Sequence, residues 1–160
     1  MIKLLRVDDR LLHGQVAFSW VRNLKIHTIV IADDRIVYDE FSKMILGLSK
    51  PSGIVLKIMG VQEAVEFLKE ESYSSMNVMA IVNSVQNARF ILEELEQLDS
   101  LNLGALRIHL NAEQVSEEVA LDEGEIKICQ QIIKQGKKVV VQCRYDDEPI
   151  DLALWLNQHK

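Results

Sequence analysis

The sequence predicts an α/β fold: a single domain with a mostly parallel central β-sheet, helices on both faces, and an active site at the carboxyl ends of the strands. Short β-branched apolar runs recur along the chain, most of them lack period-two alternation, and segments with helical spacing separate them. Strands that are covered on both faces look like this, and strands that alternate with helices form parallel sheets. Because the chain has 160 residues, of which 48% are hydrophobic, we expect one core and one domain over residues 1–160.

The elements follow in order along the chain. The runs expected to form strands are residues 2–7, 28–32, 54–59, 78–82, 106–110 and 139–143. The segments with helical spacing are residues 18–22, 41–48, 61–68, 88–98 and 126–133. The stretch 111–121 fits a loop, a short strand, or both.

Boundary residues support several of these elements. Helix starts are expected at Gly60, Asn83-Ser84 and Asp122, and a helix end at Gly136. Pro149 fits the first turn of a final helix that runs to about residue 157.

Composition excludes several classes of protein. The longest apolar runs are about five residues, far below the roughly 20 that span a bilayer. Asp8 and Asp9 interrupt the N-terminus before a signal-peptide core could form, so we expect a cytoplasmic protein. The net charge of −6 and the absence of any long basic run argue against nucleic acid as a partner. Cys129 and Cys143 are interpreted as reduced thiols in the core, without redox or zinc chemistry.

Ligands of an open parallel sheet bind beyond the carboxyl ends of the strands, so the residues after each predicted strand are the first candidates for a ligand site. They are residues 8–15, 33–35, 60, 83–84, 111 and 144–147. The densest polar cluster is the first of these segments. It combines a nucleophile, charges of both signs and a glycine, and it leads into a predicted helix.

This cluster fits a carrier of phosphoryl groups. Such a carrier needs an exposed imidazole nitrogen, a cation for the charge on the transferring oxygens, and an acceptor that orients the ring. His13, Arg10 and one of Asp8 or Asp9 can fill these roles. The amides of the next two residues, at a helix start, would face an anion favourably. Arg6 is a weaker candidate for the cation because it lies within the strand.

Other interpretations of the cluster remain open on residue chemistry alone. His13 can equally be an ordinary surface or capping histidine, and the neighbouring charges can cap a turn and pair with each other. A divalent-metal site of Asp8, Asp9 and His13 would lack further ligands of clear spacing. A receiver domain fails because the third predicted strand ends without an acceptor aspartate, and no Gly-x-Gly-x-x-Gly supports dinucleotide binding.

Residues 6–16 read Arg-Val-Asp-Asp-Arg-Leu-Leu-His-Gly-Gln-Val. This segment resembles the N-terminal signature of the EIIB components of the mannose/fructose/sorbose family in the bacterial phosphoenolpyruvate-dependent sugar phosphotransferase system (PTS). The resemblance continues in order through Asp33-Asp34, Pro51-Ser52-Gly53, Asn83 and Gly136. The length is that of a free-standing EIIB without a fused EIIA, so residues 1–160 are expected to form one EIIB domain.

The resemblance implies a phosphotransferase. His13 would accept a phosphoryl group from a phosphohistidine on EIIA, carry it on Nδ1, and pass it to a sugar that the membrane components EIIC and EIID hold during uptake. We assign catalysis to His13, Arg10, Asp8 and Asp9, and phosphate binding to Gly14, Gln15, Arg6 and Asn83. No metal or organic cofactor is required. The protein would associate peripherally with the membrane transporter, and self-association into a homo-oligomer is left open.

One departure from the family pattern is expected. Many members carry an Asn-Val-Gly-Gly-Met-like segment after the fifth strand, and the predicted counterpart here, residues 109–113, reads His-Leu-Asn-Ala-Glu. This difference leaves open a divergent paralogue that does not transport sugar and acts as a regulatory or binding protein. His109 itself is interpreted as a packed or rim histidine of the predicted strand, and Trp20 as a residue of the core or of a partner surface.

Overall fold

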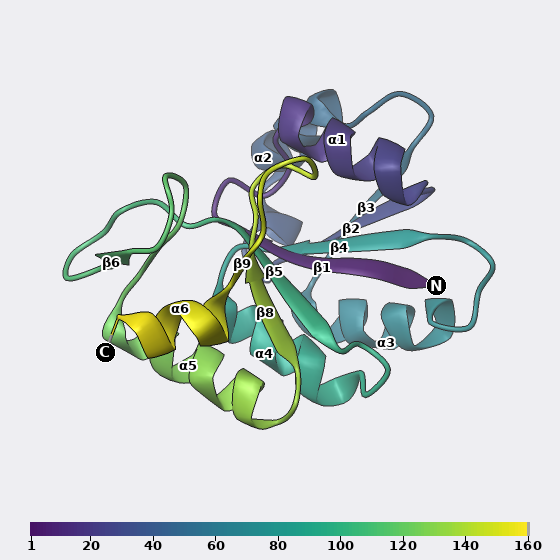
Figure 1. Cartoon of the computed structure of the whole chain (residues 1–160). Helices are drawn as coiled ribbons and strands as arrows, with labels where there is room; N and C mark the ends of the chain where they lie inside the picture. The colour runs from purple at the N-terminus through teal and green to yellow at the C-terminus, as the bar shows by residue number, and fades with distance from the viewer. Residues whose placement is uncertain (160) are drawn as a thin grey trace.

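A seven-stranded sheet forms the centre of the computed structural model, which describes residues 1–159 (Figure 1). The strand order is β3-β2-β4-β1-β5-β8-β9, and all neighbours are parallel except β8 and β9. The strands of this sheet are β1 (Ile2–Asp8), β2 (Thr28–Ala32), β3 (Val55–Met59), β4 (Val78–Val82), β5 (Ser100–Ala105), β8 (Lys138–Val141) and β9 (Ile150–Asp151). The predicted fold class is confirmed.

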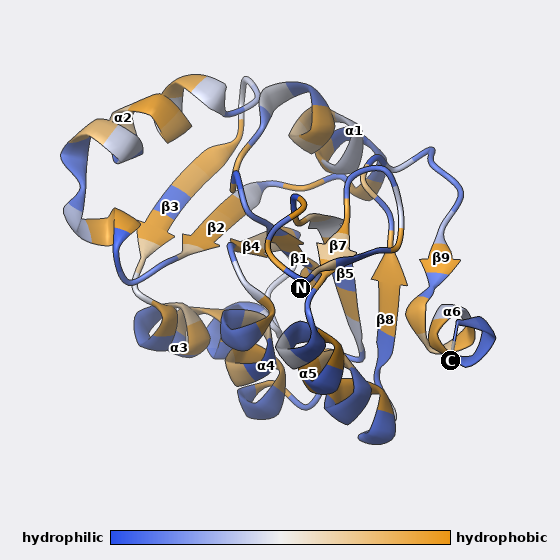
Figure 2. Cartoon of the chain, turned by 90° about the vertical axis from the view of Figure 1, so that its left-hand side faces the viewer, coloured by the Kyte–Doolittle hydropathy of each residue, from blue (hydrophilic) through white to orange (hydrophobic). Residues whose placement is uncertain are grey.

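Helices cover both faces of the sheet (Figure 1, Figure 2). The helices of the described chain are α1 (Gly14–Leu24), α2 (Glu40–Ser49), α3 (Val61–Glu71), α4 (Val85–Glu94), α5 (Glu123–Lys134) and α6 (Leu152–Gln158), with a 3-10 turn at Ile36–Tyr38. Helices α1 and α2 lie on one face and α3, α4 and α5 on the other. No helix within residues 1–159 is long and apolar enough to cross a membrane.

The sheet topology defines one crevice at the carboxyl ends of the strands. The chain leaves β1 toward β2 on one side and leaves β5 toward β8 on the other, so β1 and β5 are adjacent strands whose connections diverge. Ligand sites of open α/β sheets lie at such a point. The residues that follow β1 and β5 are therefore the ones that the fold places at a ligand site.

The fifth strand is the main error of the sequence prediction. A strand was expected at residues 106–110, whereas β5 ends at Ala105 and Ile108 and Leu110 are exposed in the loop that follows. The true strand was hidden because its apolar run is broken by Asn102 and Gly104, both of which are buried beside β1. The expected position of Asn111 at a strand end is wrong for the same reason.

Three helix details also differ from expectation. The helix predicted at 88–98 ends at Glu94, and Pro149 precedes β9 instead of opening the final helix, which begins after the N-cap Asp151. The starts at Gly60, Ser84 and Asp122 are confirmed, and Gly136 follows the C-cap of α5 with a φ of +90°. Residues 111–121 contain both a loop and a hairpin of β6 (Glu113–Gln114) and β7 (Ala120–Leu121).

Candidate functional site

The loop after β1 is fixed by its own backbone and by Asp8. One Asp8 carboxylate oxygen accepts the amide of Arg10 at 2.9 Å, and the Asp8 carbonyl accepts the amide of Leu11 at 2.9 Å. Leu11 adopts a φ of +59°, a conformation that costs a residue with a side chain about 1 kcal/mol. The buried side chains of Leu11 and Leu12 anchor the loop in the core. The loop therefore presents His13 from a defined backbone.

His13 is the N-cap residue of α1, with extended backbone (φ −123°, ψ 113°). Its side chain is exposed and makes no capping hydrogen bond. The His13 side chain thus accepts no hydrogen bond from the first-turn amides of Gly14, Gln15 and Val16. The first turn also contains no acidic residue. An N-terminus in this state favours an anion through its amides and the helix dipole.

The other α-helices within residues 1–159 differ at this point. A side-chain oxygen accepts an amide of the first turn in every one of them: Asp39 at α2, Asp34 at α3, Ser84 at α4, Asp122 at α5 and Asp151 at α6. Serine, aspartate and asparagine are the common capping residues, and a histidine that leaves its helix uncapped forgoes about 1 kcal/mol of stability. The first turn of α1 is therefore left open beside an exposed imidazole.

Arg10 lines a pocket of about 400 Å³, which we call the Arg10 pocket. Its Nε is 3.6 Å from the buried Asp8 carboxylate, which orients the guanidinium, and about a third of the side chain is exposed. The other residues that line the pocket are Asp9, Leu11, Asp33, Arg35, Ile36, Ser42, Ile45, Leu46 and Asn83. Asn83, predicted to bind phosphate, thus shares a pocket with Arg10.

Arg6 is buried beneath the loop, with 2% of its surface exposed. Its guanidinium donates to the Asn102 side chain at 2.8 Å, to the Asp8 carboxylate at 3.2 Å and to the Gln142 carbonyl at 3.3 Å, and it lies over the Trp20 ring. This geometry favours support of Asp8 over direct phosphate binding. Since Asp8 in turn holds Arg10, the buried charge of Arg6 acts on the loop through one carboxylate.

Two residues that the sequence analysis missed make room for Arg6. Asn102 accepts one of its hydrogen bonds, and Gly104 lies so close that an added Cβ would be 2.1 Å from the guanidinium carbon. Real Cβ atoms do not approach that closely, so only glycine fits there. The break of the apolar pattern in residues 100–105 was the signal that could have revealed them.

The corrected position of β5 also changes the expected departure from the family pattern. Residues 102–106 read Asn-Leu-Gly-Ala-Leu, which shares with Asn-Val-Gly-Gly-Met the asparagine and the first glycine and differs at the other three positions. Residues 109–113 lie farther along, in the exposed loop and the start of β6. The expected departure at residues 109–113 therefore depended on a strand assignment that the structure overturns.

Asp9 joins the loop to the segment after β5. One carboxylate oxygen accepts the amide of Arg107 at 2.8 Å and its Nε at 3.1 Å, while the other is buried without a partner among residues 1–159. The side-chain bonds of Asp8 and Asp9 thus run to arginines and loop amides. They fix the loop that presents His13.

A second cluster of titratable side chains, around His109, has structural partners. His109 lies on the rim of the site, in the loop after β5, with Nε2 2.7 Å from Glu125 and 3.3 Å from Asp122. A hydrogen bond to the Arg107 carbonyl, aided by Glu125 and Asp122, raises the pKa of His109. These three side chains have the spacing of metal ligands, yet Asp122 and Glu125 also form the capping box of α5.

The two cysteines are buried, and burial raises the pKa of both thiols, that of Cys129 to about 12. They are therefore unreactive thiols at neutral pH. Trp20 is a core residue whose indole donates to the Cys143 carbonyl.

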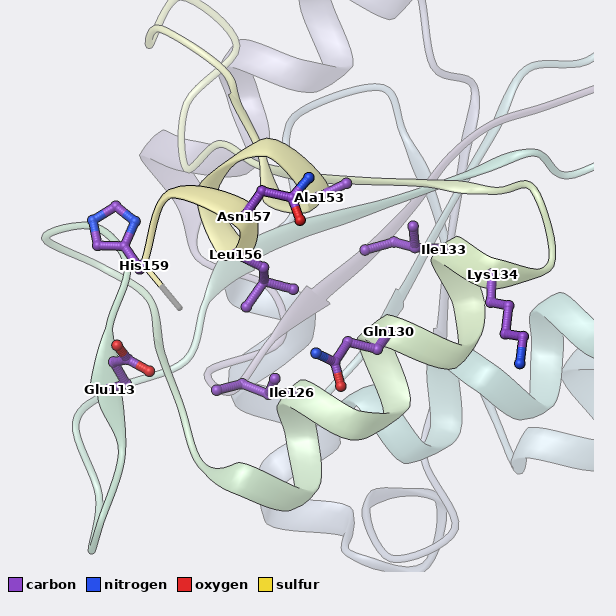
Figure 3. Close-up of a pocket in the computed structure, with 9 residues that line it drawn as sticks. All are labelled: Glu113, Ile126, Gln130, Ile133, Lys134, Ala153, Leu156, Asn157 and His159. Atoms are coloured by element: carbon purple, nitrogen blue, oxygen red, sulfur yellow. The ribbon is translucent and has the colours of Figure 1, made fainter.

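A separate hollow of about 470 Å³ lies between α5 and α6 (Figure 3). Ile126 and Gln130 come from α5, Leu156 and Asn157 from α6, and Glu113 from β6. None of the residues predicted for catalysis or phosphate binding lines it. Of those residues, Asp9, Arg10 and Asn83 line the Arg10 pocket, and His13, Gly14 and Gln15 form the start of α1.

Comparisons of the sequence and of the structure with known proteins agree on one family. The model described as "PTS system sorbose subfamily IIB component" matches residues 2–160. A Streptococcus pyogenes protein named "Probable phosphotransferase enzyme IIB component" is 35% identical over 103 residues, 64% of this chain and 63% of that protein. The mannose-specific EIIAB component of Escherichia coli K12 is 25% identical over 142 residues, which are 89% of this chain and 44% of that protein.

The chain thus spans less than two thirds of the length of these two relatives. Among solved structures, the IIBSor domain of the sorbose permease from Klebsiella pneumoniae superposes with a TM-score of 0.91 at 24% identity, covering 100% of this chain and 98% of that one. That likeness shows the fold.

Proposed function

Because the chain belongs to the sorbose subfamily of PTS IIB components, we propose that it carries a phosphoryl group on His13, from an EIIA protein to a sugar held by membrane EIIC and EIID components. EIIB components of this family are phosphotransferases that work with EIIA and with EIIC and EIID. The observation that carries the assignment to His13 is its exposed ring at the uncapped N-terminus of α1. The proposal extends to a cytoplasmic protein whose residues 1–160 form one EIIB domain.

Transfer from EIIA is an exchange of one P–N bond for another. The lone pair of the neutral His13 ring, at Nδ1 as the resemblance implies, attacks the phosphorus. The P–N bond to the donor histidine breaks, and its electron pair returns to the donor ring. The three phosphoryl oxygens carry their negative charge throughout, so fixed positive groups that face them lower the barrier.

The chain supplies such groups without needing to rearrange. Arg10 is held by Asp8, which Arg6 holds in turn, and the first-turn amides of Gly14 and Gln15, next to His13, are not capped by its side chain. Asn83 offers a side-chain amide in the lining of the Arg10 pocket. Positioning of these donors before the phosphoryl group arrives is the main contribution expected of the protein.

Transfer to the sugar reverses the roles. A sugar hydroxyl oxygen attacks the phosphorus, its proton passes to water, and the electron pair of the breaking P–N bond returns to His13. The neutral imidazole is then ready for the next cycle. The membrane components hold the sugar, so this chain needs no sugar site of its own for the proposed role.

The test is phosphorylation of the pure protein. Incubation with phosphoenolpyruvate, the two general PTS proteins and a mannose-family EIIA should add one acid-labile phosphate, about 80 Da, to the wild type and none to His13→Ala. His27→Gln is the control. His27 is exposed and precedes the amino end of β2, whereas His13 follows the carboxyl end of the parallel strand β1. Equal labelling of His13→Ala and wild type would remove His13 from the mechanism.

A further inference from the structure

One face of α2 is apolar and uncovered. Phe41, Met44, Ile45 and Leu48, which we call the α2 stripe, recur at the spacing of one helix face and are exposed by 67%, 57%, 46% and 82%. Leu46 is the one residue of this helix that is buried. Figure 2 shows α2 at the outer end of its layer with apolar segments along its length. Clustered exposed apolar side chains of this size mark interaction surfaces.

The α2 stripe borders the candidate active site. Ile45 lines the Arg10 pocket, so the stripe and the pocket share a wall. The end of α2 also lies against the start of α1, because a Cβ added at Gly14 would be 3.6 Å from the Ser49 carbonyl oxygen. A protein that covered the stripe would therefore lie beside His13.

The charges of the pocket point to the chemistry of that protein. Arg10 and Arg35 are exposed at its lining, whereas the buried Asp33 carboxylate accepts the amides of Arg35 and Ile36. Asp9 is paired with Arg107. The two exposed charged side chains of the pocket lining are therefore both arginines, and they lie beside an apolar stripe. This combination complements a protein surface that is apolar around an anionic centre.

We propose that the α2 stripe is the docking surface for phosphorylated EIIA, with Arg35 beside Arg10 receiving the charge of the incoming phosphoryl group. The inference rests on the proposed function. The donor is the partner that brings the anion to an unmodified pocket. Once His13, three residues after Arg10, carries the phosphate, its negative charge repels a second phosphorylated donor. The charge therefore favours the donor over the membrane components as the occupant.

Leu48→Glu tests this surface because Leu48 is exposed and its replacement should leave the fold intact. A carboxylate there opposes the anionic donor and removes apolar area. Initial rates of phosphorylation measured over a range of EIIA concentrations should show KM raised about tenfold or more, with kcat little changed. The matched control is Leu154→Glu, another exposed helical leucine, on α6 at the other end of the sheet, whose KM should stay at the wild-type value.

A small donor separates docking from chemistry. Phosphoramidate needs no protein surface, so Leu48→Glu and the wild type should react with it at equal rates on His13. A wild type that neither donor phosphorylates would overturn the proposed function itself. An unchanged KM for EIIA in Leu48→Glu, with the wild type active, would overturn the docking inference alone.

Two further outcomes would also overturn the assignment to EIIA. One is normal transfer from EIIA to Leu48→Glu combined with lost transfer to sugar in vesicles that contain EIIC and EIID. The other is a wild-type dimer in light scattering that becomes a monomer in Leu48→Glu without a change in KM. The first result would assign the stripe to the membrane components and the second to another copy of this chain.

Discussion

The N-terminus of α1 follows the loop after β1, and that of α5 follows the β6–β7 hairpin after the neighbouring strand β5; the two differ in what binds their first amides. At α5, Asp122 accepts the amide of Glu125 and the Glu125 side chain accepts the amide of Asp122, which completes a capping box that also binds His109. At α1, the cap position holds His13, whose side chain makes no such bond. The two loops touch through Asp9 and Arg107.

The same property of a helix N-terminus, its attraction for negative charge, thus has two different uses in this protein. Free amides and the dipole at a helix start attract negative charge. An internal carboxylate at α5 turns that attraction into stability, whereas an open first turn at α1 keeps it for a ligand. A helix start that serves an arriving anion must forgo its own cap, and the stability lost there has to come from elsewhere, here from the buried loop leucines and the Arg6 cluster.

The largest effect is expected from giving α1 the kind of cap that α5 has. His13→Asp should abolish phosphorylation by EIIA, because the nucleophile is gone and the new carboxylate takes the first-turn amides. It should also stabilise the protein by about 1 kcal/mol, since aspartate is a strong capping residue. Urea unfolding and intact mass measure the two effects. A His13→Asp variant less stable than the wild type would contradict the open first turn.

The next effect concerns the support of the loop. Gly104→Ala should destabilise the protein by about 3 kcal/mol, because the added Cβ displaces the buried Arg6 guanidinium from Asp8 and Asn102. The urea midpoint measures the loss, and residual folded protein should be phosphorylated more slowly.

Gly47→Ala is the control for that change. A Cβ at Gly47, inside α2, would meet nothing within 4 Å, so the substitution should stabilise the protein by up to about 1 kcal/mol. Equal stability of Gly104→Ala and wild type would mean that Arg6 can move without cost, and would remove it from the support of Asp8.

The two regions also differ in how well their structure could be predicted from the sequence. The loop after β1 was predicted because its residues are contiguous: Arg10, His13 and the glycine after it stand within five positions, and the motif is recognisable. The loop after β5 was misplaced because β5 carries Asn102 and Gly104 where an apolar pattern was expected. Those two residues are explained only by Arg6, which is remote in sequence and buried against them.

Long-range contacts account for the other omissions. The packing of separate elements determines three features that the sequence did not predict. They are the pairing of Asp9 with Arg107, the place of Arg35 in the lining of the Arg10 pocket, and the exposure of the α2 stripe. The stripe has the spacing of a normal core face, so sequence alone assigns it to the interior. Local sequence signals were enough to predict most of the secondary structure. They could not predict which side chains contact each other between separate elements.

The capping box of α5 should contribute stability and nothing to transfer. Asp122→Ala removes the acceptor for the Glu125 amide and should cost about 1 kcal/mol in urea unfolding. The rate of phosphorylation by EIIA should stay at the wild-type value. A rate reduced as much as the rate of an Arg10→Ala variant would show that the α5 start takes part in the site and would erase the contrast with α1.

The smallest effect is a pH dependence carried by His109. Its pKa is raised above the ordinary 6.5 of the unfolded chain by the Arg107 carbonyl and by Glu125 and Asp122, so protonation stabilises the folded state. That contribution is fully present below pH 6.5 and is lost as the pH rises through the folded-state pKa. His109→Gln should therefore lose stability relative to the wild type at pH 5.5 and approach it at pH 8.5. The charged side chains that face the ring are Asp122 and Glu125, so the urea midpoints should be compared at both pH values in the wild type, His109→Gln and Asp122→Ala. A gap that widens toward pH 8.5 would mean that His109 is held in its neutral form.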